Sequence, residues 1–427
     1  MKTAKVPEMS EQTTSEFHIQ RYRKSDREGV FDLWRSTHSG DSADRLICQW
    51  DWKYDHNPFN REAELSRRAS RERVREFIEA THFGPQAERQ RSRYRSYLLE
   101  SDGNDDDPDI FLLKKNDREV LGMICSFPQL FQVGGTPQWV FVECDWIVHP
   151  EYRNKHFSFQ LANRLRSGYA LGFGWLGVNA QRIIGNRHDA IGAKQILSQP
   201  PPTGVKRAMP LVKPIDWRYL ATRYTQNRFL RSAASVLAAN ATPLRHVFAG
   251  RARIPGVSVV QIESFDDVID RLWQRASRDY PVMAVRDRRY LNWRFVARPD
   301  ATYTMLTAVN GSETIGYLIF RVREDGGQPI GYLVDYLVEN RSAAVFSLLL
   351  RHAEDKLLRD RVKAIVCNVA SPPYRGTLIR HGYFPVLLDT RGYLSAAANS
   401  FDPKLRVFTD LRRWFVTMGD GDLDMSF

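Results

Sequence analysis

The chain has 427 residues, of which 43% are hydrophobic and 26% are charged, and its formal net charge is +12. This length exceeds that of one ordinary domain, while no run of about 18 apolar residues and no apolar secretion signal is present, so we expect a cytoplasmic protein of two domains without a transmembrane segment. The positive charge suits an anionic partner, namely a coenzyme, a nucleotide-linked substrate, nucleic acid or a membrane surface.

The first hundred residues predict a short folded start followed by a charged insertion. Residues 1–16 are polar and are predicted to be flexible, residues 17–22 alternate like a strand, and residues 26–35 have the period of a helix. Segment 61–109 contains ten arginines and seven glutamates up to Glu100. Because the glutamates offset much of the positive charge, we favour an exposed face over a nucleic-acid arm.

Two hairpins and a helix follow the insertion. Asn116-Asp117 and Gly134-Gly135 predict the two turns. The elements expected around them are strands at 111–115, 120–127, 131–133, 138–148 and 173–178, and helices at 156–169 and near 189–195. Three prolines at 200–202 mark a boundary. The basic segment 213–256 beyond them is interpreted as a helical connector rather than a membrane-surface helix.

The cysteines predict neither a disulfide framework nor a metal site. Their spacing matches no metal-ligand pattern, and three of them lie in apolar, strand-like runs. We therefore expect four buried thiols: Cys48, Cys125, Cys144 and Cys367.

From about residue 257 the pattern of the first half begins again. The ordered matches are Leu33-Trp34 with Leu272-Trp273, Trp52-Lys53-Tyr54 with Trp293-Arg294-Phe295, Pro58 with Pro299, Gly122 with Gly316, Asp145 with Asp335, and Asn179 with Asn368. Only the distance from the second tryptophan to the glycine differs greatly, 70 residues in the first half and 23 in the second. The charged segment accounts for this difference, so the chain is predicted to be two diverged copies of one domain.

Each copy is predicted to have an α/β fold with a mixed, mostly antiparallel twisted sheet flanked by helices. The expected organisation is a flexible N-terminus at 1–16, a first domain at 17–212 with the insertion at 61–109, a helical connector at 213–256, and a second domain at 257–427 that ends in an acidic tail.

The residues after the strand at 138–148 carry a resemblance to a known family. Val148-His-Pro-Glu-Tyr-Arg153-Asn-Lys-His-Phe-Ser158, followed by a helix with Leu161 and Leu165, resembles the GCN5-related N-acetyltransferase (GNAT) superfamily, here in a tandem form. In that family a strand ends in a valine-x-proline turn, and an R/Q-x-x-G-x-G/A loop then opens a helix. The resemblance implies an acyl-coenzyme A donor, which is acetyl-CoA or another acyl-CoA, and no metal.

The resemblance also implies a donor-binding site. Backbone N–H groups of the loop and the positive end of the helix hold the pyrophosphate, and the pantetheine arm lies beside the strand like an added strand. The residues implied are Trp146, Ile147, Val148, Arg153, Asn154, Lys155, His156, Phe157, Ser158 and Asn179. His156 departs from the family's small residue, so either its imidazole donates to a phosphate or the loop no longer binds coenzyme A.

Acyl transfer to an amine needs a base that removes a proton from the nucleophile. Alternation along 138–148 places Trp139, Phe141, Glu143, Asp145 and Ile147 on one face, next to the acyl cleft that the resemblance implies. Asp145 recurs in the second copy as Asp335, whereas Glu143 aligns with Leu333. We therefore rank Glu143 above Asp145 as the catalytic base.

The second copy lacks the donor loop. Its matching segment is Val338-Glu-Asn-Arg-Ser-Ala, so we interpret this copy as a domain for packing or acceptor binding. Tyr374 is interpreted in the same way. The tail aspartates Asp420, Asp422 and Asp424 are interpreted as solvated.

The sequence favours an N-acyltransferase that acts on a small amine, such as an amino sugar in cell-surface polysaccharide synthesis. Two alternatives stay open. A Fem-like transferase that uses aminoacyl-tRNA agrees with the +12 charge, although we consider a nucleic-acid partner the weaker option. A GNAT-like binding protein without catalysis is the second alternative. The oligomeric state is left open.

Overall fold

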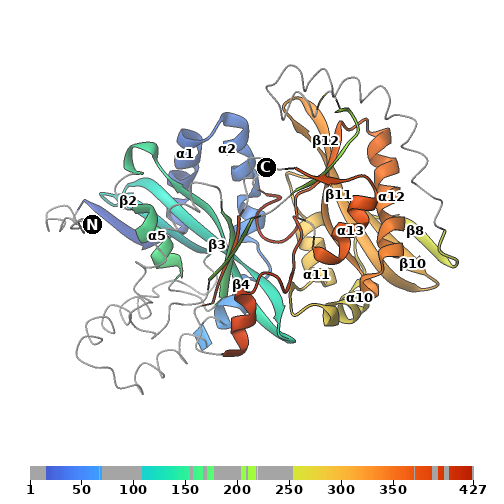
Figure 1. Ribbon diagram of the computed structural model, residues 1–427. Coiled ribbons are helices and arrows are strands. Elements are labelled where there is room, and N and C mark those ends of the chain that lie inside the picture. Colours follow the sequence, from blue (N-terminus) through green and yellow to red (C-terminus); the bar gives the residue numbers. More distant parts are fainter. Residues whose placement is uncertain are drawn as a thin grey trace, which may run out of the picture. The chain divides into compact units, whose positions relative to one another are not determined.

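Figure 1 shows the computed structural model of the chain, in which two units are distinguished. The first is formed by residues 1–129, 139–172 and 187–201, and the second by residues 130–138, 173–186 and 202–427. The structure describes residues 16–66, 68–69, 108–153, 157–166, 171–176, 203–207, 210–217, 219, 253–369, 371–386, 393–398 and 403–425. Residues 1–15, most of the predicted insertion, the predicted helix near 189–195 and most of the predicted connector lie outside this part.

The first unit is built on an antiparallel sheet in the order β1-β2-β3-β4. Its elements are β1 (Phe17–Arg21), α1 (Arg27–Thr37), α2 (Gly40–Trp50), the π-helical turn η3 (Asp51–Asp55), β2 (Asp109–Lys115), β3 (Glu119–Val133), β4 (Thr136–Val148), the 3₁₀ turn η4 (Pro150–Tyr152), α5 (Phe157–Arg166) and the start of β5 (Leu171–Leu176). The loop between β2 and β3 is residues 116–118, in which Asn116 and Asp117 both have positive φ and Arg118 N donates to Lys115 O at 3.2 Å, as in a tight turn. The two predicted hairpins are confirmed, with the strands at 120–127 and 131–133 forming one long β3.

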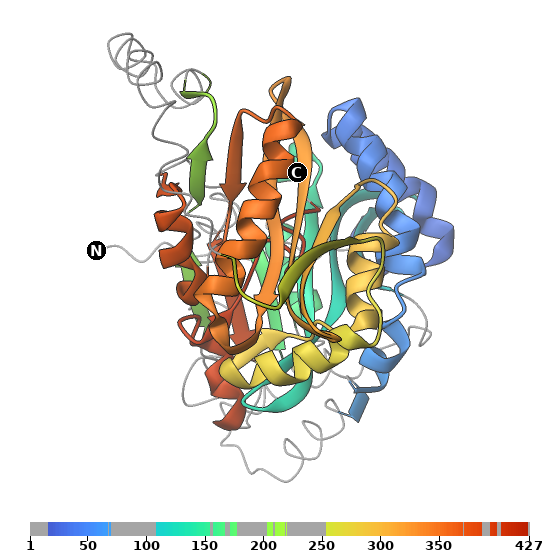
Figure 2. The ribbon, with the colours of Figure 1, turned by 90° about the vertical axis from the view of Figure 1, so that its right-hand side faces the viewer.

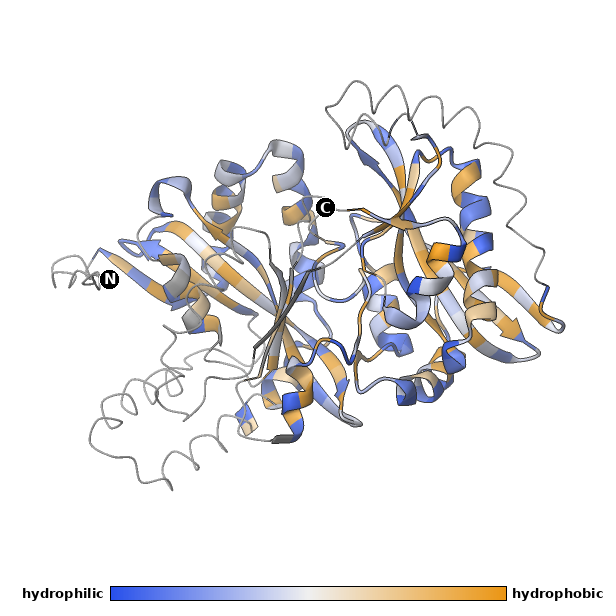
Figure 3. Ribbon diagram, viewed as in Figure 1, coloured by the Kyte–Doolittle hydropathy of each residue, from blue (hydrophilic) through white to orange (hydrophobic). Residues whose placement is uncertain are grey.

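Helices cover both faces of this sheet. On one face α5 packs Phe157, Leu161 and Leu165 against strand residues that include Ile124 and Phe141. On the other face α1 comes so close to β3 that a Cβ at Gly29 would lie 2.8 Å from Val120 Cγ2. Figure 3 shows apolar residues concentrated along the central strands, where these helices bury them.

The second unit carries a seven-stranded sheet in the order β14-β7-β13-β12-β11-β10-β8. Its elements are β6 (Thr203–Arg207), β7 (Leu211–Pro214), β8 (Val257–Ile262), α10 (Val268–Ala276), the 3₁₀ turn η6 (Ser277–Asp279), β9 (Val282–Ala284), α11 (Arg288–Leu291), the π-helical turn η7 (Asn292–Val296), β10 (Thr304–Asn310), β11 (Glu313–Asp325), β12 (Gln328–Val338), the 3₁₀ turn η8 (Glu339–Arg341), α12 (Ala343–Arg359), β13 (Ala364–Cys367), α13 (Pro372–Arg380), β14 (Phe384–Pro385), β15 (Tyr393–Ala398), the 3₁₀ helix η9 (Pro403–Thr409) and β16 (Trp414–Phe415). Figure 2 shows α12 lying along the sheet. Only the β12–β13 pair in this sheet is parallel.

Residues that match in the sequence occupy matching places in the two units. Trp52-Lys53-Tyr54 and Trp293-Arg294-Phe295 lie in the two π-helical turns η3 and η7. A Cβ at Gly122 would lie 3.1 Å from Ile147 O and 3.1 Å from Val148 Cγ2, and a Cβ at Gly316 would lie 3.2 Å from Leu337 O and 2.6 Å from Val338 Cγ1. Each glycine thus lets its strand approach the end of the next strand.

The predicted fold class is confirmed, since both units pack helices on mixed, mostly antiparallel sheets. The boundaries that the structure gives are more interleaved than 17–212 and 257–427. In particular β7, where the first predicted domain ends, pairs with β13 and β14. Among the helices that the structure describes, none is long and apolar enough to cross a membrane.

The cysteines are free, and three of them are buried as expected. The prediction was wrong for Cys48, which is exposed on α2. An amphipathic helix buries only the residues on its inner side. In α2 these residues are Ala43, Gln49 and Trp50, and Cys48 lies on the outer side. Within the described residues, no group of three or more histidine, cysteine, aspartate or glutamate side chains is arranged to hold a metal ion.

Candidate functional site

The strand β4 is interrupted three residues before its end. Asp145 has φ +46°, a left-handed conformation that non-glycine residues adopt only when the surroundings hold them there. Trp139 and Phe141 before the interruption, and Trp146 and Val148 after it, all pack on the apolar cluster of α5. The alternation of the strand therefore changes phase at Asp145.

This phase change corrects the prediction that five alternating residues share one face. Asp145 lies on the opposite face from Phe141, because its carboxylate meets Lys53 and Tyr54 of the turn η3. Tyr54 also contacts the neighbouring Cys144, with 3.2 Å between Oη and Sγ. Glu143 is half-buried on the regular part of the strand, where alternation keeps it on the Phe141 side. The two candidate carboxylates are thus not neighbours on one face.

A buried ionic cluster holds Asp145. Lys53 Nζ lies 2.8 Å from Asp145 Oδ2, and the two side chains are only 2% and 10% exposed. Tyr54 Oη donates a second hydrogen bond of 2.5 Å to the same oxygen. Burial, and next the charge of Asp145, raises the pKa of Tyr54 well above 10, so the phenol stays protonated and remains a donor.

The sequence interpretation missed Lys53 and Tyr54 as partners of Asp145. The available signal was the match of Lys53 with Arg294, which places a cation at the same position of the repeat. A buried lysine needs an anion nearby, and each half of the chain offers one recurring aspartate.

The first part of the implied donor loop is ordered by its own hydrogen bonds. Arg153 Nε donates to Val148 O at 3.0 Å, and Tyr152 N donates to His149 O at 2.9 Å. Phe157 is buried and Ser158 is half-buried in the first turn of α5. The structure therefore brings Trp146, Ile147, Val148, Arg153, Phe157 and Ser158 together around the end of β4. Asn154, Lys155, His156 and Asn179 lie outside the described residues.

Two polar ring atoms beside this loop are buried without a hydrogen-bond partner among the described residues. They are Trp146 Nε1 and His149 Nδ1. Buried polar groups normally find a partner, and an orphaned one requires an explanation. Trp146 and His149 precede Arg153 by seven and four residues, and Trp146 packs against the apolar cluster of α5.

The matching part of the second unit is arranged differently. Its recurring aspartate, Asp335, binds Arg286 and accepts hydrogen bonds from Tyr317 and Thr417 at 2.8 and 2.7 Å. After β12 the chain turns through Asn340 and Arg341, both with positive φ, and enters α12. Tyr374 is fully buried and accepts a hydrogen bond from Val338 N at 3.2 Å.

The acidic C-terminal segment, Trp414–Met425, is buried throughout. The interpretation of its aspartates as solvated was wrong. The carboxylates of Asp420 and Asp424 face the guanidinium groups of Arg286, Arg298 and Arg321, which are themselves buried. Arginine side chains that are remote in the sequence stabilise these charges, so the acidity of the segment alone gave no sign of its burial.

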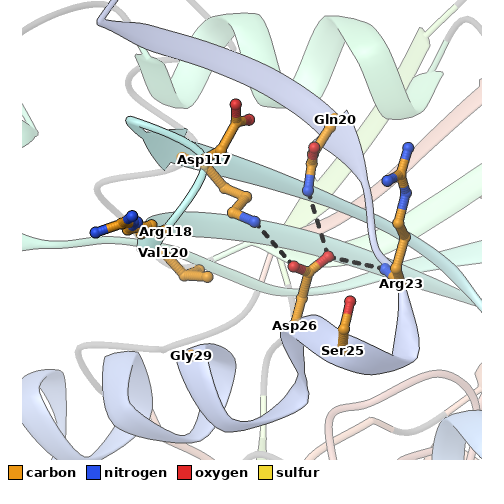
Figure 4. Close-up of a pocket in the computed structure, with 9 residues that line it drawn as sticks. Gln20, Arg23, Ser25, Asp26, Gly29, Asp117, Arg118 and Val120 are labelled. Carbon is orange, nitrogen blue, oxygen red and sulfur yellow. Dashed lines mark hydrogen bonds and ion pairs between the residues drawn. The ribbon is translucent and has the colours of Figure 1, made fainter.

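The first unit also has an open cavity of about 540 Å³ between β1, the β2–β3 turn and the start of α1 (Figure 4). At its floor Asp26 accepts hydrogen bonds from Gln20 Nε2, Arg23 N and Lys114 Nζ. The Lys114–Asp26 pair, at 2.9 Å, is almost as buried as the Lys53–Asp145 pair. Since this pair satisfies its own charges, the cavity offers no excess of buried charge to a ligand.

Comparison with known proteins identifies the fold. Residues 71–176 match the profile of the acetyltransferase (GNAT) family. No curated protein matches the chain. Saccharomyces cerevisiae N-myristoyltransferase with bound myristoyl-CoA is similar at a TM-score of 0.50 and 12% identity, over 96% of this chain and 86% of that chain. A conserved Enterococcus faecalis protein described as a probable N-acyltransferase has a TM-score of 0.48 and 11% identity, over 92% of this chain and 74% of that chain.

The sheets, the end of β4 with the turn η4, the helix α5 and the profile match at residues 71–176 together indicate a protein of the acyltransferase class. The GNAT match covers residues 71–176, and the chain as a whole has a fold similar to that of the yeast acyltransferase.

Proposed function

We propose that the chain is an N-acyltransferase that takes an acyl group from acyl-CoA and transfers it to the amine of a small acceptor. The donor site lies in the first unit, at the end of β4 and the start of α5. The observation that carries this proposal is the interruption of β4 at Asp145, followed by the ordered turn that leads to the N-terminus of α5. We also propose that the two units are diverged copies, which divide the binding of donor and acceptor between them.

Several features support the donor site. We propose that the left-handed residue Asp145 turns backbone groups of β4 toward an amide-containing ligand such as pantetheine. The orphaned Trp146 Nε1 and His149 Nδ1 are polar atoms at the same place. The family to which residues 71–176 are matched uses this strand and loop for coenzyme A, and the similar yeast enzyme is described with myristoyl-CoA bound.

Glu143 is proposed as the base that accepts the proton of the attacking amine. Asp145 is bound by Lys53 and Tyr54, so it serves better as an anchor for the strand than as a base. In the reaction the amine nitrogen bonds to the acyl carbon, the thioester C–S bond breaks, and coenzyme A leaves as the thiol. The departing thiolate takes a proton from water, which balances the proton that the amine gives to Glu143.

Calorimetry with the full chain tests the donor site. Acetyl-CoA, octanoyl-CoA and coenzyme A are titrated separately, and we expect saturable binding of one equivalent per chain. Exchange of Trp146 for phenylalanine removes the orphaned Nε1–H and keeps the packing on α5, so it separates a polar contact from a packing effect. If no coenzyme A thioester binds at high protein concentration, the proposal is wrong.

Release of the coenzyme A thiol tests the chemistry. With a panel of amino sugars and other small amines, Glu143→Gln should lower kcat about 100-fold or more while the affinity for the donor is kept, because a positioned base typically contributes this much. The thiol reagent will also detect the exposed Cys48, so the assay uses a Cys48→Ser background. Unchanged turnover in Glu143→Gln would exclude Glu143 as the base.

The net charge of +12 supports a second candidate donor, aminoacyl-tRNA. When many cationic side chains bind a polyanion, they release its condensed counterions. The affinity therefore falls steeply as the salt concentration rises. We would accept this donor if tRNA bound with such a salt dependence and coenzyme A thioesters did not bind. RNA affinity that is absent or insensitive to salt eliminates it.

A further inference from the structure

The second unit contains a gap between two strands of its sheet. β12 and β13 pair in parallel only at Gly331–Ile365 and Tyr332–Val366, although β12 continues for six residues to Val338. Past this point the described part of β12 binds no strand on the β13 side; Val338 N donates to Tyr374 Oη at 3.2 Å, and Val334 O is bound by the C-terminal segment. Gly419 N donates to Val334 O at 2.8 Å.

The C-terminal segment follows the gap from one side to the other. Ser371, which follows β13, exchanges hydrogen bonds of 2.8 and 3.0 Å with the backbone of Val416. Asn368 Nδ2 lies 3.5 Å from Met418 Sδ. The segment is therefore bound by a backbone carbonyl of β12 on one side, and by the side chains of two residues that follow β13 on the other. An extended peptide can be bound in a similar way at a sheet edge.

Four buried arginines complete the groove. Arg294 donates to the carbonyl oxygens of Gly419 and Gly421 at 3.2 and 3.3 Å. Arg286 lies 2.7 Å from Asp420, and Asp424 is held between Arg298 at 2.8 Å and Arg321 at 2.9 Å. A cluster of buried guanidinium groups is costly unless anions neutralise it. The groove is thus built for a peptide that carries carboxylates at two of these positions.

The groove also selects glycine. A Cβ on Gly419 would lie 3.0 Å from the ring of Phe295 and 3.1 Å from Asp335 Cβ. Gly421 has φ +71°, and a Cβ on it would lie 3.0 Å from the ring of Phe173. Gly419-Asp420-Gly421 therefore fits a narrow channel that larger residues would obstruct.

β12 is the counterpart of β4, as the matching pairs Gly122–Gly316 and Asp145–Asp335 show. We propose that the second unit, at the place where the first unit is proposed to bind pantetheine, has a groove for an acidic, glycine-containing peptide, and that the chain's own C-terminal segment occupies it. Each chain then has one donor site, in the first unit. This inference rests on the proposed function only for the statement about the donor site.

A cleavable chain tests the groove. A specific protease site is inserted between Arg412 and Arg413, whose side chains are 87% and 60% exposed. After cleavage the parent chain should retain the C-terminal peptide through gel filtration, and the Asp424→Asn chain should lose it. Asp410→Asn is the matched control, because its partners Arg412 and Arg413 are exposed, and it should retain the peptide like the parent.

A labelled synthetic peptide of residues 414–427 provides the second measurement, which does not depend on the folding of any variant. It should exchange into the cleaved parent chain, and the Asp424→Asn and Gly419→Ala peptides should compete about 100-fold less well. Equal competition by all three peptides overturns the proposed groove.

Coenzyme A titration separates this inference from the proposed function. One equivalent before and after displacement of the peptide agrees with a single donor site. A second equivalent after displacement would mean that the groove is a blocked donor site, and would overturn the inference. If coenzyme A never binds while the peptide discrimination holds, the proposed function fails and the peptide groove stands.

Discussion

The two units present the same recurring aspartate in different surroundings. In the first, Asp145 is neutralised within its own unit by Lys53 and Tyr54 from the adjacent π-helical turn. In the second, the residue that matches Lys53 is Arg294, which instead binds the C-terminal segment, and Asp335 is neutralised by Arg286. The forked guanidinium group of an arginine presents several N–H donors, so Arg294 can bind carbonyl oxygens outside its own turn η7. The two matching cations thus have different partners: Lys53 binds the aspartate at the end of its own sheet, and Arg294 binds the C-terminal segment.

The comparison also indicates how two similar sheets acquire different roles. The turn after β4 is ordered by Arg153 and leads to a helix N-terminus, a favourable place for phosphate groups. The turn after β12 contains two positive-φ residues, and the gap beside β12 is filled by the chain itself. The first unit therefore keeps the features of a donor site, whereas the second uses the same strand to bind peptide.

The largest effect is expected from breaking the anchor in the first unit. Lys53→Met keeps the length of the side chain but leaves a buried carboxylate with only the Tyr54 hydroxyl, so the free energy of unfolding should fall by about 3 kcal/mol. Urea denaturation measures this loss. Donor affinity should fall as well, since Asp145 would no longer be held in the left-handed conformation that shapes the end of β4.

Lys114→Met is the matched control for Lys53→Met. It breaks the other buried lysine–aspartate pair of the first unit, at a nearly equal distance and burial, but at the cavity of Figure 4. A similar loss of stability with unchanged donor affinity is expected. If the two variants weaken donor binding equally, the effect is general destabilisation, and the positioning role of Lys53 is excluded.

A smaller effect is expected from adding a methyl group at the matching glycines. Gly316→Ala places a Cβ 2.6 Å from Val338 Cγ1, and Gly122→Ala places one 3.1 Å from Val148 Cγ2. Overpacking of this kind costs about 1–3 kcal/mol, and the tighter site, Gly316, should cost more. Only Gly122→Ala should weaken the donor, as measured by calorimetry. Weaker donor binding in Gly316→Ala would place part of the donor site in the second unit.

The sequence predicted the strands and the repeat because both depend on local patterns. Alternation, turn residues and recurring tryptophans were sufficient for the two hairpins and for the match of Gly122 with Gly316. The single-face arrangement of Glu143 and Asp145 was wrong because one residue in a left-handed conformation reverses the alternation. No local sequence pattern predicts the left-handed conformation of Asp145, because the residues that stabilise it, Lys53 and Tyr54, are about ninety residues earlier in the chain.

The burial of the C-terminal segment could not be predicted either, because it too depends on residues that are distant in the sequence. Its aspartates are neutralised by three arginines from separate parts of the second unit. Arg286 lies in the loop after β9, Arg298 lies in the loop after η7, and Arg321 lies on β11. The spacing of acidic residues in a terminal segment is the same for a solvated tail and for a buried one. Only the three-dimensional fold brings the arginines together.

The smallest effect, and the one most specific to the peptide groove, is a pH dependence of opposite sign at two aspartates. Burial opposes ionisation of Asp424, but Arg321, Arg298 and Arg294 outweigh it, and its pKa is lowered below 3.8. Asp424 therefore stabilises the fold above pH 3.8, and this contribution is lost as the pH falls through its folded-state pKa. The difference in unfolding free energy between the parent and Asp424→Asn should shrink on acidification.

Asp420 should show the reverse. Burial raises its pKa above 3.8, Arg286 only partly offsets the burial, and the nearby Asp335 adds to the rise. The unfolded state then loses its proton first, so ionisation of Asp420 costs stability as the pH rises from 3.8 through the raised pKa. Relative to the parent, Asp420→Asn should gain stability over that interval, at a slope of at most about 1.4 kcal/mol per pH unit. Urea denaturation between pH 3 and 7 measures both variants. Parallel pH curves for the two asparagine variants would show that the groove does not distinguish its two carboxylates, and that its arginines act as a diffuse positive surface rather than as separate sites.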